Sequence, residues 1–210
     1  MKSKKKVLLI SESNFLLDAA FERHKDCLYL RDLAVAEELQ LVIPEYAFAE
    51  VEAKLASFEV YWLNMFEKAK AVLEELPASR RQREAHTQRL NTFDDCIALI
   101  SDSLQEARDG VNALYAVTLQ IAFTPEIDIA ARLRRVRGRP PHDVKDLEIY
   151  ESILYFARQN QASNLNMIFL ERDKAHFDVP EVKAELADVG VEIYFSAADV
   201  VKHVRELLGK

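Results

Sequence analysis

LLISESNFLLDAAF, residues 8–21, begins as a strand and ends as a helix. Its first residues extend a short apolar run from Val7, which is typical of a strand buried on both faces of a parallel sheet. The apolar spacing that follows predicts a helix with Ser13 or Asn14 as its N-cap. Glu12 stands between the two, where the buried strand ends. A carboxylate is useful at that edge of a parallel sheet, because ligands bind beyond the carboxyl ends of the strands.

Strand-like and helix-like segments alternate along much of the chain, which favours an α/β fold with a mainly parallel central sheet. Short apolar runs predict strands at residues 6–11, 39–44, 165–171 and 191–196. Apolar residues at steps of three and four predict helices at residues 13–24, 31–40, 111–123, 125–137, 146–159, 180–190 and 197–208.

A long helical hairpin stands between these segments. From Glu45 onward, apolar residues recur at helical spacing, interrupted by "LPAS" at residues 76–79. We expect an antiparallel pair of helices of about thirty residues per arm, longer than most globular helices. Gly110 is expected to end or kink the second arm. We interpret the stretch from about 54 to 120 as an insertion in one domain that spans residues 1–210.

Composition and hydropathy limit the classes of protein to which this chain can belong. The chain has 210 residues, of which 50% are hydrophobic, so it can bury a substantial core. The apolar run at residues 7–10 is too short for a signal peptide, and no stretch approaches the roughly 20 apolar residues of a membrane helix. We therefore expect a cytoplasmic protein without a membrane partner, in which Cys27 and Cys96 are buried free thiols.

The charge distribution bears on possible partners. A net charge of −7 argues at first against nucleic acid, but residues 132–142, "RLRRVRGRPPH", hold five arginines and no acid. A local basic patch decides where phosphates dock, whatever the net charge. Two other interpretations stay open: the arginines form a solvated helix face, or they pair with acids elsewhere in the chain.

Four acids stand at the expected ends of strands or in the first turns of helices, in segments far apart in the sequence. They are Glu12 in "LLISESNFLL", Glu50 in "LVIPEYAFAEVEAKL", Asp146 in "DVKDLEIYESIL" and Asp173 in "MIFLERDKAHF". In their order and contexts, these four stretches resemble the motifs of the PIN domain family of nucleases.

The likeness can be followed motif by motif. Glu12-Ser13-Asn14 stands where the family has Asp-Thr-Asn after its first strand, and Glu50 matches an inward Glu on a helix started by proline. "DLEIYESIL" from Asp146 and "FLERDKAHF" around Asp173 match the third and fourth motifs. The resemblance covers nearly the whole chain, with the hairpin as an elaboration, and it implies a three-layer α/β/α fold.

The resemblance also implies a chemistry and partners. Converging carboxylates repel one another unless a cation neutralises them, and Mg²⁺ or Mn²⁺ suits such an oxygen-rich site. Glu12 and Asp146 would be the main metal ligands, Asp173 a ligand or the holder of a metal-bound water, and Glu50 an acid acting through water. The implied activity is a metal-dependent endoribonuclease acting on RNA, in some relatives the toxin of a toxin–antitoxin pair. An antitoxin and a second copy of the chain are the implied protein partners.

Supporting residues follow from the same comparison. Asn14, with Ser13 beside it, would brace the acids by hydrogen bonds, although a simple capping role for Asn14 is equally consistent with the sequence. The expected RNA-binding residues, which would steer phosphate groups, are Arg135, Arg137, Arg139 and Lys145.

One departure from the family pattern motivates a second hypothesis. The first acid of the family is usually Asp, and Glu12 is longer by about 1.5 Å, which shifts any metal that it holds. The alternative is therefore a catalytically impaired PIN-like module that binds RNA or a protein partner. Simpler roles also stay open: Glu12 or Asp146 as a helix cap, Asp143 as the ligand in place of Asp146, and His176 as a surface histidine.

Overall fold

A parallel β-sheet forms the centre of the molecule. The computed structural model describes residues 6–76, 82–163 and 165–210. Within them, every pair of neighbouring strands is parallel, and the strand order is β3-β2-β1-β4-β5. The strands are β1 (Lys6–Ser11), β2 (Gln40–Pro44), β3 (Leu119–Ile121), β4 (Leu165–Leu170) and β5 (Val191–Tyr194). The expected parallel sheet is confirmed.

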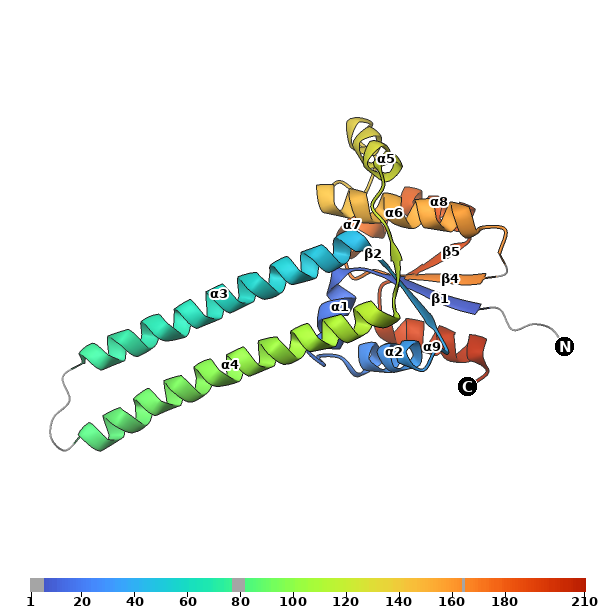
Figure 1. Ribbon diagram of the computed structural model, residues 1–210. Coiled ribbons are helices and arrows are strands. Elements are labelled where there is room, and N and C mark those ends of the chain that lie inside the picture. Colours follow the sequence, from blue (N-terminus) through green and yellow to red (C-terminus); the bar gives the residue numbers. More distant parts are fainter. Residues whose placement is uncertain (1–5, 77–81, 164) are drawn as a thin grey trace.

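Helices cover both faces of the sheet, so the fold has three layers (Figure 1). The side chains of β1 alternate between the faces: Val7 and Leu9 enter one hydrophobic core, and Leu8 and Ile10 enter the other. The first core is closed by α1 (Ser13–Ala20), α2 (Lys25–Val35) and α9 (Ala197–Leu208). The second is closed by α5 (Pro125–Val136), α6 (Val144–Asn160), the short α7 (Lys174–Phe177) and α8 (Pro180–Asp188).

The helical hairpin is the connection between β2 and β3. It consists of α3 (Glu45–Glu75) and α4 (Arg83–Val117), which lie side by side and project away from the sheet (Figure 1). At its base, Val51 and Leu104 are buried in the first core, whereas the outer part is held together by contacts such as that of Phe66 with Phe93. The hairpin therefore begins directly after β2, at Glu45, where the helical pattern was expected to start.

Two expectations about the hairpin's second arm are wrong. The helix α4 continues through Gly110, whose missing Cβ allows close approach to α1, because a Cβ there would lie 3.3 Å from the Cα of Ala20. The helix expected at residues 111–123 ends at Val117, and the chain then forms β3 beside β2. Pairing with a remote strand overrides the helical apolar spacing of this segment.

The bounds of the other helices and strands differ less from those expected. The helix expected at residues 31–40 is placed wrongly, since α2 ends at Val35 and the chain turns through Glu37, whose φ is 57°. Among the described residues, no helix combines the length and the apolar character needed to cross a membrane.

Candidate acidic site at the carboxyl edge of the sheet

Two buried glutamates lie next to each other where the strand order reverses. The chain runs from β1 outward to β2 and β3, and β4 and β5 lie on the other side of β1, so the reversal falls between β1 and β4. Ser11 at the end of β1 is aligned with Leu170 at the end of β4. The next residues are Glu12 and Glu171, with exposed fractions of 5% and 3%. Ligands of doubly wound sheets bind in the crevice at this point.

The two carboxyl groups are expensive to ionise together. Burial, followed by the charge of Glu12, raises the pKa of Glu171 to about 8. Backbone N–H groups of Arg172 and Asp173 donate to Oε1 of Glu171 at 2.7 and 2.8 Å, which partly offsets this cost. Burial also raises the pKa of Glu12. A proton or a cation is therefore needed between these acids at neutral pH.

Glu12 is only half satisfied by hydrogen bonds. Its Oε2 accepts from the hydroxyl of Ser13 and from the backbone N–H of Asn14, both at 2.9 Å. Its Oε1 is buried and has no hydrogen-bond partner among the described residues. A buried carboxylate oxygen without a partner is costly, and this cost disfavours the ionised form of Glu12.

A second acidic group lies at the same edge of the sheet. Asp146, in the first turn of α6, and Asp173, after β4, both contact Nδ1 of His176, at 2.7 and 3.2 Å. One donor atom from each of the three residues lies within 4.8 Å of the others, close enough to hold one metal ion. The hydrogen bond to the carboxylate of Asp146 raises the pKa of His176, while burial raises the pKa of Asp146. When protonated, the imidazole is a counterion for both acids.

Glu50 is held beside Glu12 by lysines. Lys54, one turn further along α3, lies 3.2 Å from Oε1 of Glu50 and donates to the hydroxyl of Ser13 at 3.0 Å. Lys145 lies 3.7 Å from the same Glu50 oxygen. The side chain of Glu50 is only 14% exposed. The base of the hairpin therefore forms one wall of the site, and Glu50 is part of that wall.

In the structure the four predicted acids do not share one cluster but belong to neighbouring groups of side chains. Asp146 and Asp173 share the metal-competent cluster, whereas Glu12 and Glu50 lie outside it. After burial, the charges of Glu12 and of Asp146 both raise the pKa of Glu171. Glu171 therefore interacts with acids of both groups.

The capping roles differ from those expected. Glu12, not Ser13 or Asn14, is the N-cap of α1, so its capping role and its place in the site coexist. Asn14 contributes its backbone N–H to the carboxylate. At α6, the N-cap is Asp143, which leaves Asp146 free to face His176.

The arginines of residues 132–142 differ in whether they form ion pairs. Arg134 is buried and pairs with two glutamates, and Arg139 also pairs with two, including the Glu185 that contacts Arg134. Pairing with acids therefore holds for these two residues, while a phosphate contact of Arg139 stays a prediction, since its side chain is 41% exposed. Arg135 and Arg137 are exposed, with no ion pair to any described residue.

Glu171 and Lys54 are participants that the sequence analysis does not name, and His176 is one that it interprets as a surface histidine. Glu171 was assigned to the end of a strand, although it follows β4 as Glu12 follows β1. His176 stands three residues after Asp173, and Lys54 stands four residues after Glu50, spacings that place side chains on one face of a helix. These two spacings are the features of the sequence from which His176 and Lys54 could have been predicted as members of the site.

Comparison with known proteins identifies no relative. No family model matches the chain, and no curated protein or solved structure matches it. The function must therefore be argued from the residues of the site.

Proposed function

We propose that this protein is a PIN-like, metal-dependent endoribonuclease. The observation that carries the proposal is the cluster of Asp146, Asp173 and His176, whose donor atoms lie within 4.8 Å of one another. Two further buried acids, Glu12 and Glu171, stand beside it at the reversal point of the sheet. Acids from remote segments that converge at the ligand-binding edge are better explained by a shared cation than by capping alone.

The donor set fits a divalent ion such as Mn²⁺ or Mg²⁺. Two carboxylates and an imidazole would hold it, and carboxylates are the groups that both ions prefer. A bound ion would supply a water of lowered pKa and positive charge for the phosphodiester oxygens. A cation bound beside Glu12 and Glu171 would favour their ionised forms, and the exposed Lys145 attracts the phosphate backbone.

The likeness to PIN domains supports the choice of RNA as substrate. The all-parallel sheet has helices on both faces, and the four motif acids belong to the segments that the likeness requires. The same likeness makes an antitoxin protein and a second copy of the chain the expected protein partners.

The test is cleavage of single-stranded RNA by purified protein with Mn²⁺, with and without a chelator. We expect chelator-sensitive cleavage that Asp146→Asn abolishes. The matched control is Asp143→Asn, three residues earlier at the N-cap of the same helix, where Asn can also cap, so this variant should retain cleavage. Cleavage by Asp146→Asn at the wild-type rate, or cleavage indifferent to the chelator, would contradict the proposal, provided that circular dichroism shows both variants folded.

A second candidate is a binding module without catalysis. The specific observation is that Lys54, Lys145 and His176 already lie against the acids and offset part of their charge. Calorimetry with Mn²⁺ separates the candidates. Binding that Asp146→Asn weakens favours the nuclease, and no binding at millimolar Mn²⁺ favours the module.

A further inference from the structure

Two lysines from remote parts of the chain meet on one carboxylate at the wall of the acidic site. Lys54 belongs to the hairpin, and Lys145 stands in the first turn of α6, directly before Asp146. Their ammonium groups lie 3.2 and 3.7 Å from the same atom, Oε1 of Glu50. Among the described residues, no other acid lies within ion-pair distance of either lysine. Two cations therefore share one anion. We call Lys54 and Lys145 the lysine pair.

The three side chains differ in their exposure to solvent. The side chain of Glu50 is only 14% exposed, whereas those of Lys54 and Lys145 are 32% and 56% exposed. The shared carboxylate is thus largely covered, and the ammonium groups remain accessible to a ligand. Two ammonium groups close together repel each other unless anions neutralise them, and one carboxylate neutralises only one. An anion that binds both lysines removes this repulsion.

A second contact fixes the position of Lys54. Its Nζ donates to the hydroxyl of Ser13 at 3.0 Å, and that hydroxyl donates to Oε2 of Glu12 at 2.9 Å. An ammonium group has three N–H donors, of which Ser13 accepts one and the ion pair with Glu50 occupies at most one more. At least one N–H therefore has no acceptor among the described residues. Because ordering a flexible lysine costs free energy on binding, an ammonium group that is already fixed favours a ligand.

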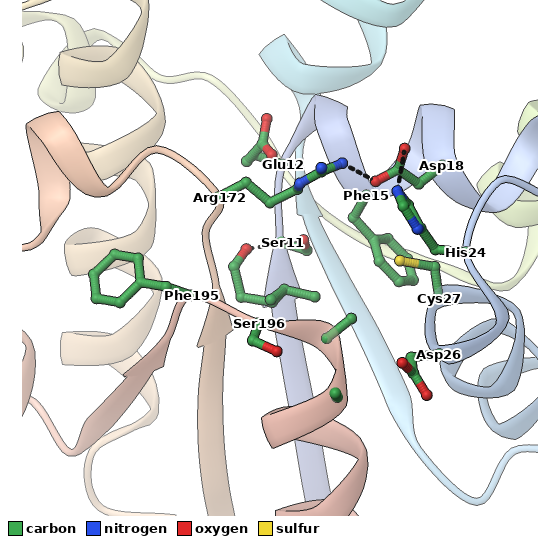
Figure 2. Close-up of a pocket in the computed structure, with 13 residues that line it drawn as sticks. Ser11, Glu12, Phe15, Asp18, His24, Asp26, Cys27, Arg172, Phe195 and Ser196 are labelled. Atoms are coloured by element: carbon green, nitrogen blue, oxygen red, sulfur yellow. Dashed lines mark hydrogen bonds and ion pairs between the residues drawn. The ribbon is translucent and has the colours of Figure 1, made fainter.

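Arg172, which follows β4, differs from the lysine pair in its charge balance. It lines a pocket of about 260 Å³ together with Glu12 (Figure 2). Its guanidinium forms an ion pair with the buried Asp18, drawn as a dashed line in the same view, so one cation faces one anion there. The pocket therefore offers an anion no excess of positive charge, in contrast to the lysine pair.

Resting on the proposed function, we infer that Lys54 and Lys145 bind one phosphate group of the RNA and that Glu50 positions them. Lys145 directly precedes Asp146, so this phosphate lies at the same edge of the sheet as the metal-competent cluster. A phosphodiester carries one negative charge, which equals the excess charge of the lysine pair over Glu50. Its two non-bridging oxygens offer one acceptor to each ammonium group. Glu50 then acts on the lysines and not on the metal, and the hairpin supplies part of the RNA site.

The test counts the phosphate charges that the protein neutralises. On logarithmic scales, the affinity for single-stranded RNA falls with salt concentration with a slope of about 0.7 per neutralised phosphate. The assay is fluorescence anisotropy with a short single-stranded RNA in a chelator, so that the RNA stays intact. We expect Lys54→Gln and Lys145→Gln each to weaken binding on the order of 10-fold. The double variant should lower the slope by about 0.7, the loss of one phosphate contact.

The matched control is Lys70→Gln on the same helix. The side chain of Lys70 is 26% exposed and contacts two acids, Glu74 and Asp94, so this variant removes the same charge from a similar environment. It lies roughly 24 Å further along α3 than Lys54. We expect it to bind RNA like the wild type, with the same salt dependence.

Several outcomes overturn the assignment. They are wild-type affinity in Lys54→Gln, equal weakening by Lys70→Gln, and no binding of RNA by the wild type. Inorganic phosphate that binds as tightly as the RNA at equal ionic strength would mean that the lysine pair holds a small phosphate ligand instead. If Lys54→Gln does not fold, Lys145→Gln gives the same test, because the side chain of Lys145 is 56% exposed.

Cleavage assays with Mn²⁺ separate the RNA contact from the nuclease. If the wild type cleaves RNA and both lysine variants bind RNA like the wild type, the lysine pair is not an RNA site and the nuclease stands. If the wild type binds RNA through the lysine pair but does not cleave it, the RNA site stands and the nuclease is refuted.

Discussion

Replacing the buried Glu171 by Gln should stabilise the protein at alkaline pH. The folded state raises the pKa of this carboxyl group from 4.5 to about 8. Each tenfold change in proton affinity corresponds to about 1.4 kcal/mol, so its ionisation costs the folded state at most about 5 kcal/mol. Because the folded state binds the proton more tightly, stability falls as the pH rises from 4.5 to about 8 and then levels off.

The Gln side chain removes this dependence and keeps the hydrogen bonds. Its carbonyl oxygen can still accept from the N–H groups of Arg172 and Asp173, and its amide can donate towards Glu12. We therefore expect no gain near pH 5 and a gain of a few kcal/mol above pH 8, with about 5 kcal/mol as the limit. Repulsion from Glu12 contributes to the raised pKa, so part of the gain reflects removal of that repulsion.

The assay is urea unfolding between pH 5 and 9 in the presence of a chelator, so that no bound cation replaces the proton. Glu52→Gln is the control, because Glu52 is exposed on α3 and forms no ion pair with any described residue. Its curve should follow that of the wild type. If the free energies of unfolding of wild type and Glu171→Gln differ by the same amount at every pH, the pKa of Glu171 is not raised in the folded state.

Two further predictions concern the metal cluster and the hairpin. His176→Gln should weaken Mn²⁺ binding about 10- to 100-fold, measured by calorimetry, because the imidazole positions Asp146; unchanged affinity would exclude His176 from the site. Gly110→Ala should destabilise the protein by about 1–3 kcal/mol in urea unfolding, because the new Cβ would lie 3.3 Å from the Cα of Ala20. A stabilised variant would mean that helix propensity outweighs this close contact.

Local patterns were sufficient to predict much of the fold. The strands β1, β2, β4 and β5 are short apolar runs, and the hairpin has apolar residues at helical spacing, so each follows from neighbouring residues alone. The same patterns place Glu12 and Asp173 after strands, at the edge where parallel strands end together. The predictions for β3 and for Gly110 were wrong. The conformation of β3 depends on pairing with β2, and the role of Gly110 depends on the distant Ala20.

Hydrophobic periodicity marks the ends of the strands, so the residue types that stand there follow from the chain alone. Which acids share an environment depends instead on how remote segments pack together. Glu12 and Glu171 become neighbours through the register of β1 with β4, and Lys54 reaches Ser13, next to Glu12, because the hairpin starts directly after β2. Burial and the charge of remote segments set the cost of ionising a carboxyl group, and neither can be read from the residues adjacent to it in the chain.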